Sequence, residues 1–269
     1  MFGGYALINS DQYANSRNYE ARLFLNANFR TNQDSKAKWL FNLFPKKENQ
    51  NVLELGCGTG LFWLANRHSI PKSWQLTLTD YSEGMLEETK KTLSKVERKF
   101  NYEIVNAETI RYPDRTFDII LANNMLYHID DKEKALAHIK RVLTNDGYFI
   151  PATQGKNDMI ELNRLLYAYL EHKGTVLRFS ERSFSLDNGL DQLKPYFTKI
   201  AVKRFKNSLQ ITEVDPIINY FLSFNGMIEN KEILPDKYVE GFREYLHSIL
   251  VREKSLPVRK EEGVFICSN

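Results

Sequence analysis

Three glycines, Gly56, Gly58 and Gly60, alternate with other residues directly after an apolar segment that contains one acid, Glu54. Glycine lets the backbone turn sharply and leaves room for a ligand to lie on the main chain. The residues before the glycines, 51–55, are typical of a buried strand, and those after them, 61–65, of a helix. Strand, glycine loop and helix in this order predict a nucleotide-binding crevice at the carboxyl end of a first strand.

The spacing of the glycines disfavours two common nucleotide-binding loops. In a dinucleotide loop a glycine or alanine stands three positions after the second glycine, where this chain has Leu61. A phosphate-binding P-loop requires Gly-Lys followed by Ser or Thr, and this stretch has no such sequence. A nicotinamide-dependent oxidoreductase is therefore a disfavoured alternative.

An acid follows the second predicted strand. Residues 75–80 alternate between polar and apolar side chains and end in Asp80. A carboxylate at this strand end can accept hydrogen bonds from both hydroxyls of a ribose, and such charge-assisted bonds are strong. The alternative is a surface acid without a ligand. Because the glycine loop precedes it, we expect Asp80 to bind the sugar of a nucleoside.

Tyr127 and His128 follow the fourth predicted strand, 117–122. The carboxyl ends of parallel strands open onto the ligand crevice, so this segment should line it. His128 is the best candidate for a general base because the pKa of imidazole lies near neutral pH. Tyr127 can orient an acceptor by hydrogen bonding. The structural alternative is that Tyr127 packs and His128 caps the next helix.

The elements that must position these residues follow from periodicity and capping signals. Apolar residues at helical spacing predict helices over 16–28, 34–44, 82–95, 130–143, 158–171, 212–223 and 235–252. Ser82 and Thr212 are the expected N-caps of two of them, and Gly147 is expected to end the helix 130–143. Alternation predicts further strands over 102–108, 148–153, 199–206 and 263–267.

The composition bounds the class of protein. The chain has 269 residues, of which 42% are hydrophobic and 26% charged, as in soluble globular proteins. A net charge of +3 argues against a dedicated nucleic-acid binder. Cys57 and Cys267 can build neither a disulfide framework nor a metal site alone, so we expect no metal and a reducing, cytoplasmic environment. No apolar run is long enough for a membrane span, and the start lacks the basic region of a signal peptide.

Residues 52–60 resemble motif I of the class I S-adenosylmethionine-dependent methyltransferases, in which an acid and three alternating glycines follow an apolar strand. The resemblance is continuous over 51–153 and weaker beyond. The series ELGCGTG, LTDYSEGML, NNMLYH, FSLDNG and SLQIT is similar to a group of stand-alone bacterial methyltransferases of this class. The resemblance implies S-adenosylmethionine as cofactor, with S-adenosylhomocysteine as product. The segment after the fourth strand lacks Asn-Pro-Pro-Tyr, which disfavours adenine and glutamine as acceptors.

The resemblance also implies roles for individual residues. A cofactor of this kind needs flat backbone beside its amino-acid part and a carboxylate near its ammonium group. In the family, an apolar residue just after the acid of the second strand packs on the adenine, and the first side chain after the third strand bonds the adenine amino group, a bond that the amide oxygen of Asn106 can accept. The implied cofactor-binding residues are Glu54, Gly56, Cys57, Gly58, Gly60, Asp80, Tyr81, Met85, Asn106, Ala107, Glu108, Asn123 and Met125. In the family, helices before motif I often fold over the cofactor as a lid, so Tyr13, Tyr19, Arg22 and Phe29 are candidate lid contacts. Alternatively, the aromatic rings pack the lid and Arg22 is solvated.

The implied fold is a Rossmann-like α/β domain. It has a seven-stranded, mostly parallel sheet flanked by helices, with the last strand antiparallel between the fifth and sixth. We expect an N-terminal helical lid over 1–45, the cofactor-binding core over 46–206, a helical insert that forms part of the substrate pocket over 207–256, and the final core strand over 257–269.

The expected activity is transfer of a methyl group to an oxygen or nitrogen atom of a small molecule by in-line displacement. Alignment of the reacting atoms can supply about 7–11 kcal/mol of catalysis, and a base is needed only if the acceptor keeps its proton. One alternative is an RNA or protein methyltransferase, which would need a local basic groove. Another is a non-catalytic cofactor-binding or interaction protein. The acceptor and the oligomeric state, monomer or homodimer, stay open.

Overall fold

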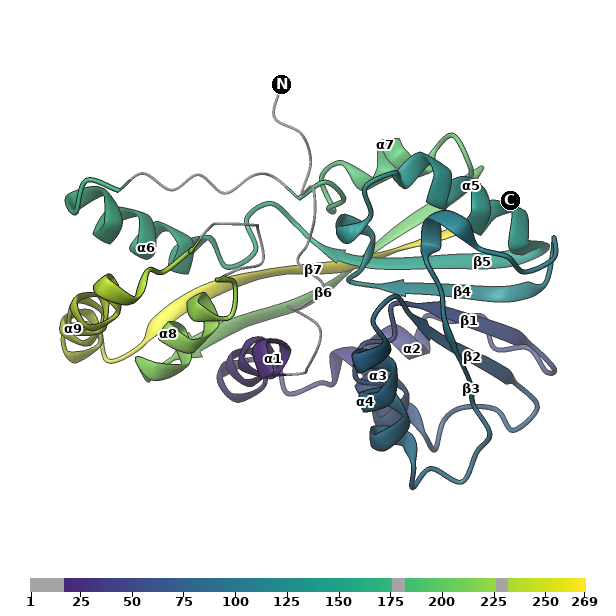
Figure 1. Ribbon diagram of the computed structural model, residues 1–269, viewed down its shortest axis with the longest axis horizontal. Coiled ribbons are helices and arrows are strands. Elements are labelled where there is room, and N and C mark those ends of the chain that lie inside the picture. The colour runs from purple at the N-terminus through teal and green to yellow at the C-terminus, as the bar shows by residue number, and fades with distance from the viewer. Residues whose placement is uncertain (1–16, 176–181, 226–231) are drawn as a thin grey trace. The chain divides into compact units, whose positions relative to one another are not determined.

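The computed structural model describes residues 17–175, 182–225 and 232–269 (Figure 1). Its strands are β1 (Asn51–Leu55), β2 (Gln75–Asp80), β3 (Asn101–Ile104), β4 (Phe117–Asn123), β5 (Leu143–Gln154), β6 (Lys199–Ile211) and β7 (Leu256–Ser268). Its α-helices are α1 (Arg17–Phe29), α2 (Lys36–Asn42), α3 (Leu61–Asn66), α4 (Glu83–Leu93), α5 (Lys132–Val142), α6 (Ile160–His172), α7 (Gly189–Leu193), α8 (Asp215–Leu222) and α9 (Asp236–Glu253). Short 3-10 turns, η2 (Ala107–Thr109) and η3 (Leu126–His128), follow β3 and β4.

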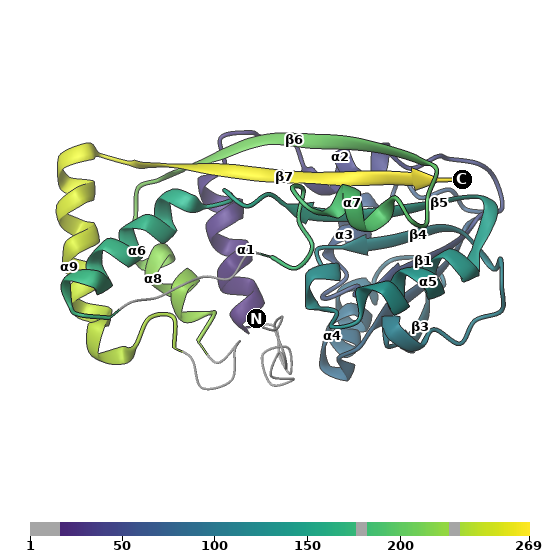
Figure 2. The same ribbon diagram turned by 90° about the horizontal axis from the view of Figure 1, so that it is seen from above.

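The strands form a seven-stranded sheet in the order β3-β2-β1-β4-β5-β7-β6. Strands β1 to β5 pair in parallel, and β7 is antiparallel to β5. Figure 2 shows β6 and β7 side by side. The predicted Rossmann-like α/β fold and the place of the last strand are confirmed. Since β1 lies between β2 and β4, the strand order reverses there, and ligands of such sheets bind at the carboxyl ends beside this point.

The described residues divide into two compact units. The sheet unit comprises 34–155, 183–205 and 262–269. The helical unit comprises the described parts of 1–33, 156–182 and 206–261. Strands β6 and β7 contribute residues to both units.

The sheet unit has an apolar cluster on each face of its sheet. Leu53 and Leu55 of β1 pack with the apolar face of α5 and with α7. Val52, which points the other way, packs with α2, α3 and α4. Alternate residues of a strand face opposite sides, so the two clusters follow from the sequence of β1. A strand buried on both faces fits the centre of a parallel sheet.

The helical unit has its own apolar core. Leucines of α6 pack with residues of α1, α8 and α9 and with parts of β6 and β7. In the same unit, Lys260 and Asp158 form an ion pair of 3.0 Å whose side chains are both almost fully buried. The second carboxylate oxygen of Asp158 accepts the Glu261 N–H at 2.9 Å. Of the helices in the described ranges, none has the length and apolarity to cross a membrane.

The ends of the helices confirm one predicted cap and correct two others. Ser82 caps α4 as predicted, since its hydroxyl accepts the Met85 N–H at 3.3 Å. Thr212 does not cap α8, because that helix begins at Asp215 after Val214 and has a proline in its first turn. Gly147 does not end α5. The helix ends at Val142, and Leu143 pairs with Phe117 in the sheet, so strand pairing replaces a glycine cap.

The two units divide the chain differently from the expected domains. The expected lid, 1–45, is split: α1 belongs to the helical unit and α2 to the sheet unit. Leu40 and Phe41 of α2 pack with the tryptophans beside β1 and β2, which explains that placement. The described residues of 156–182, expected in the core, belong to the helical unit because the apolar face of α6 packs there. The expected insert, 207–256, also contains the end of β6.

Candidate functional site

The glycine loop adopts the backbone that its sequence requires. Gly56, Gly58 and Gly60 have φ angles of +71°, +57° and +73°, in the left-handed region that favours glycine. A Cβ at Gly56 would lie 2.9 Å from the Cβ of Met125, and one at Gly60 would lie 3.0 Å from a methyl of Thr89. At Gly58 a Cβ would meet no atom within 4 Å. The loop is therefore closed at both ends and open at Gly58, where a ligand can lie on the backbone.

Asp80 lies against this loop. Its Oδ2 accepts the Gly58 N–H at 2.9 Å, and its Oδ1 accepts the Ser82 N–H at 2.9 Å. Each carboxylate oxygen has a second lone pair with which to accept a ribose hydroxyl. Burial raises the pKa of Asp80 above its ordinary value, against the effect of these backbone hydrogen bonds. Asp80 and the glycine loop thus lie together, and the binding of a ribose by Asp80 stays a prediction.

Glu54 lies inside the fold beneath the loop. Its side chain is 1% exposed, and its Oε2 accepts the indole N–H of Trp63 at 2.5 Å. Burial raises the pKa of Glu54 to about 8, the hydrogen bond from Trp63 opposes this shift, and the charge of Asp80 adds to it. A carboxyl group with this pKa holds a proton over much of the neutral range. The predicted pairing of Glu54 with a ligand ammonium stays a prediction.

Cys57 and Thr59 fill the turn between the glycines. The Cys57 N–H donates to the Thr79 carbonyl at 2.8 Å, and its thiol lies 3.4 Å from the hydroxyl of Thr89. Burial raises the pKa of the Cys57 thiol, so it is not a thiolate nucleophile. The Oγ1 of Thr59 is buried and lacks a hydrogen-bond partner within the described residues. A hydrogen-bond donor of a bound ligand would satisfy such an atom. Thr59 is not among the predicted site residues, although a hydroxyl side chain between two loop glycines is a signal from which it could have been found.

The predicted adenine platform follows Asp80. Tyr81 is 72% exposed, so its ring is available to a planar ligand, whereas Met85 is buried within α4. An exposed aromatic ring next to Asp80, the acid that we expect to bind a ribose, fits a nucleoside. The contact of either side chain with adenine stays a prediction.

The segment after β3 uses its polar side chains for local structure. The amide oxygen of Asn106, which we expected to face adenine, accepts the Glu108 N–H at 2.8 Å and caps the η2 turn. The carboxylate of Glu108 accepts the N–H groups of Asp130 and Asp131, both at 3.2 Å. Ala107 is buried in the turn. A cofactor can therefore use the amide nitrogen of Asn106 more readily than its oxygen, and contacts of Glu108 and Ala107 with it stay predictions.

A chain of amides follows β4. The Asn124 side chain donates to Asn123 Oδ1 at 3.0 Å, and Gln154, the last residue of β5, donates to Asn124 Oδ1 at 2.7 Å. Met125 comes next and packs against Gly56. Asn123 and Met125 are among the predicted site residues, whereas Asn124 and Gln154 are not. Their signal is weak: each is an amide at the carboxyl end of a parallel strand.

Tyr127 and His128 lie in the η3 turn, which begins at Leu126 directly after Met125. Their rings lie 4.3 Å apart between centroids, and the Tyr127 carbonyl accepts the Ser183 hydroxyl at 3.0 Å. His128 does not cap the next helix, because Asp131 does so by accepting the Lys134 N–H at 2.9 Å. The structural alternative for His128 is therefore wrong, and its role as a base stays a prediction.

The candidate lid residues lie in the helical unit or outside the described ranges. Tyr13 precedes the described residues, and Tyr19 lies in α1. Arg22 donates to the Ser223 carbonyl at 2.9 Å, and its guanidinium lies 5.1 Å from the centroid of the Phe224 ring. Phe29 is buried in the core of this unit. Arg22 is thus held by α8 rather than simply solvated, and contact of these four residues with the cofactor stays a prediction.

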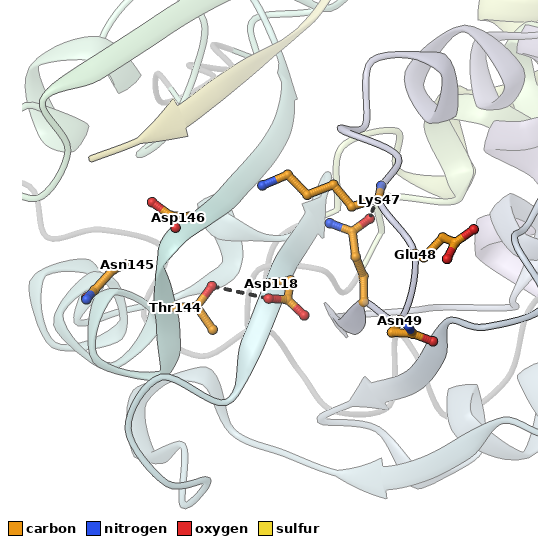
Figure 3. A pocket seen from close by; sticks show the side chains of 8 residues that line it. Lys47, Glu48, Asn49, Asp118, Thr144, Asn145 and Asp146 are labelled. Atoms are coloured by element: carbon orange, nitrogen blue, oxygen red, sulfur yellow. Dashed lines mark hydrogen bonds between the residues drawn. The ribbon is translucent and has the colours of Figure 1, made fainter.

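A hollow also exists at the opposite edge of the sheet. Figure 3 shows it between the residues before β1 and the first residues of β4 and β5. Its lining is polar: Lys47, Glu48, Asn49, Gln50, Asp118, Thr144, Asn145 and Asp146. Asp118 accepts the Asn51 N–H at 2.8 Å and the Thr144 hydroxyl at 3.4 Å, so its carboxylate holds the strand ends together. Across the described parts of the chain, no group of three or more acidic, histidine or cysteine side chains is arranged to hold a metal ion.

Known proteins resemble the chain over the same region. A family model described as a methyltransferase domain matches residues 53–150. A ubiquinone/menaquinone biosynthesis C-methyltransferase, UbiE, from Cronobacter sakazakii is 33% identical over 128 residues, which are 47% of this chain and 51% of that protein. A malonyl-[acyl-carrier protein] O-methyltransferase from Ilyobacter polytropus is 28% identical over 160 residues, 60% of this chain and 54% of that protein.

The chain thus spans about half the length of these two curated relatives. Among solved structures, the YcgJ protein from Bacillus subtilis has a TM-score of 0.56 at 18% identity, covering 87% of this chain and 98% of that one. At this identity the likeness shows the shared fold.

Proposed function

Because this chain belongs to the class I S-adenosylmethionine-dependent methyltransferases, we propose that it transfers a methyl group from that cofactor to an oxygen or nitrogen atom of a small-molecule acceptor. The observation that carries the proposal is the contact of Asp80 with the open glycine loop at Gly58. A carboxylate that is bonded to the loop and retains free lone pairs suits a ribose, and the open backbone suits the amino-acid part of S-adenosylmethionine.

S-adenosylmethionine supplies a methyl group already activated by a positively charged sulfur. The contribution of the protein is therefore mainly alignment. Gly58 offers flat backbone, Asp80 accepts the ribose hydroxyls, and Thr59 Oγ1 supplies a further polar atom. Met125 and the η3 turn border the loop on the side of β4. The bound cofactor would supply the methyl group, with its sulfur as the leaving group, and His128 would take the proton of an acceptor that still carries one.

The choice of an oxygen or nitrogen acceptor rests on the side chains that end β4 and β5. Asn124, Gln154, Tyr127 and His128 all carry hydrogen-bonding groups, which suit a polar acceptor better than a carbon nucleophile. One relative is named a C-methyltransferase and the other an O-methyltransferase, so similarity alone does not choose between these acceptors.

Calorimetry on the full chain tests the proposal. We expect S-adenosylhomocysteine to bind with one-to-one stoichiometry and NADH not to bind. A radiolabelled methyl donor is then offered with hydroxyl, amine and activated-carbon acceptors, and we expect transfer to a hydroxyl or an amine. NADH binding without S-adenosylhomocysteine binding would reject the cofactor. Transfer only to carbon would reject the acceptor class, and binding without any transfer would favour a cofactor-binding protein.

A further inference from the structure

Besides Thr59 Oγ1 in the glycine loop, a buried oxygen at the end of β5 also lacks a hydrogen-bond partner among the described residues: Oε1 of Gln154. A buried amide oxygen loses its bonds to water, so folded proteins rarely leave one unsatisfied, and each such atom calls for an explanation. Gln154 ends β5, a strand that pairs with β4 up to the register of Asn123 with Ala152. Neither the fold nor the predicted cofactor contacts use this oxygen.

The orientation of the Gln154 amide follows from its neighbours. Its nitrogen donates to Asn124 Oδ1 at 2.7 Å, and the nitrogen of Asn124 donates to Asn123 Oδ1 at 3.0 Å. Each amide of this chain therefore donates in the same direction, toward Asn123. Because an amide has one donor end and one acceptor end, the atom left over at the Gln154 end is an acceptor.

The backbone that holds this chain of amides has an uncommon conformation. Asn124 has a φ of +58°, which non-glycine residues seldom adopt although asparagine tolerates it best. Its N–H donates to the Ala152 carbonyl at 2.9 Å, which ties it to β5. The next residue, Met125, packs directly against Gly56. The amide chain therefore starts in the segment that borders the glycine loop.

The neighbouring charges do not satisfy the oxygen. Glu262 is the β7 residue opposite Gln154, and it forms an ion pair of 2.7 Å with Lys36. The Lys36 ammonium is thus directed to a carboxylate. Gln154 also contributes its backbone carbonyl to the Leu186 N–H at 3.0 Å, so its main chain is fixed while Oε1 stays without a partner.

We propose that Oε1 of Gln154 accepts a hydrogen bond from an O–H or N–H group of the methyl acceptor and so selects acceptors that carry a polar hydrogen. The proposal rests on the methyl transfer proposed above. In this role Gln154 is a positioning and specificity residue: it orients the acceptor, and Asn123 and Asn124 fix the direction of its amide.

Pairs of small probes in which methyl groups replace the donor hydrogens test the proposal without turnover. Phenol and anisole form one pair, and aniline and N,N-dimethylaniline the other. Their binding to the complex of the full chain with S-adenosylhomocysteine is measured by ligand-observed NMR. We expect phenol and aniline to bind at least fivefold more tightly than their methylated partners. The Gln154→Leu variant should lose this preference and bind S-adenosylhomocysteine within twofold of the unaltered protein.

Two further variants control for folding and chemistry. Gln154→Asn keeps both the donor and the acceptor end of the amide on a shorter side chain and should keep part of the preference for the donor, which guards against a folding defect in Gln154→Leu. Gln75→Leu removes an exposed glutamine at the start of β2 and should change nothing.

Equal binding within each pair, no binding of either member, or a preference that survives in Gln154→Leu would overturn the proposal. A tenfold loss of S-adenosylhomocysteine affinity in Gln154→Leu would assign the oxygen to the cofactor instead. Failure of the proposed function is a different result, namely no binding of S-adenosylhomocysteine by the unaltered protein.

Discussion

The two edges of the parallel sheet each hold a half-buried acid, but their polar atoms are used differently. At the amino edge, the Asp118 carboxylate accepts hydrogen bonds from the Asn51 N–H and the Thr144 hydroxyl. None of the eight residues that line the hollow there has a buried side-chain polar atom without a partner. At the carboxyl edge, Thr59 and Gln154 each bury an unpartnered oxygen. A hollow in the surface is thus weaker evidence of a ligand site than buried polar atoms that the protein leaves unsatisfied.

The largest effect is expected at Gly58, the open point of the carboxyl edge. In Gly58→Val the new side chain takes up the open space over the loop, so S-adenosylhomocysteine binding should be undetectable by calorimetry. The left-handed backbone adds strain of about 1–2 kcal/mol. Gly174→Val is the matched control, because Gly174 has a φ of +73° and equal open space in the helical unit. Equal affinity in the two variants would mean that no ligand lies on the loop.

The next effect concerns turnover at the same edge. Replacing His128 with alanine should lower kcat by about 100-fold, the contribution typical of a general base, and leave S-adenosylhomocysteine affinity unchanged. His68→Ala removes an exposed histidine of the sheet unit and serves as the control. Steady-state kinetics with the acceptor found by the radiolabel assay measure the effect. Full activity of His128→Ala would leave this histidine without a catalytic role.

The buried acid beneath the loop predicts a dependence of stability on pH. The pKa of Glu54 is raised from 4.5 to about 8, so the folded state holds a proton that the unfolded state releases. The free energy of unfolding should therefore fall as pH rises from 4.5 to about 8, by about 2 kcal/mol between pH 6 and 8. Glu54→Gln should lack this fall, and Glu87→Gln, an exposed control, should keep it. Parallel curves for Glu54→Gln and the unaltered protein in urea denaturation would contradict the prediction.

The two half-buried acids form the smallest and most direct contrast. Asp80→Ala should weaken S-adenosylhomocysteine binding by about tenfold, or about 1.4 kcal/mol, through lost charge-assisted hydrogen bonds. Asp118→Ala should leave that affinity unchanged and lower the free energy of unfolding by about 1 kcal/mol, through loss of its bond to Asn51. Calorimetry and urea denaturation measure the two quantities. If both variants change S-adenosylhomocysteine affinity and the free energy of unfolding to the same extent, the two edges do not differ in function.

The features predicted correctly share one property: they depend on residues close together in the sequence. The turn at Gly56, Gly58 and Gly60 and the capping of α4 by Ser82 involve a few neighbouring residues each. The place of Asp80 needed one further rule, that the carboxyl ends of parallel strands meet at one edge.

The missed or corrected features depend on residues far apart in the sequence. The orientation of the Gln154 amide is set by its hydrogen bond to Asn124, thirty residues earlier. Gly147 is no helix cap because Leu143 finds a partner in Phe117. Helix α2 joins the sheet unit because Phe41 packs with Trp63 and Trp74. None of these partnerships leaves a local pattern in the chain.

The amino-acid sequence by itself determined the order of strands and helices, the glycine loop and the acid that serves it, because periodicity, turns and caps are set by neighbouring residues. Only the tertiary structure decided which polar atoms remain without partners. Satisfaction of a buried oxygen depends on every group that packing brings within about 3 Å of it, and those groups come from distant parts of the chain.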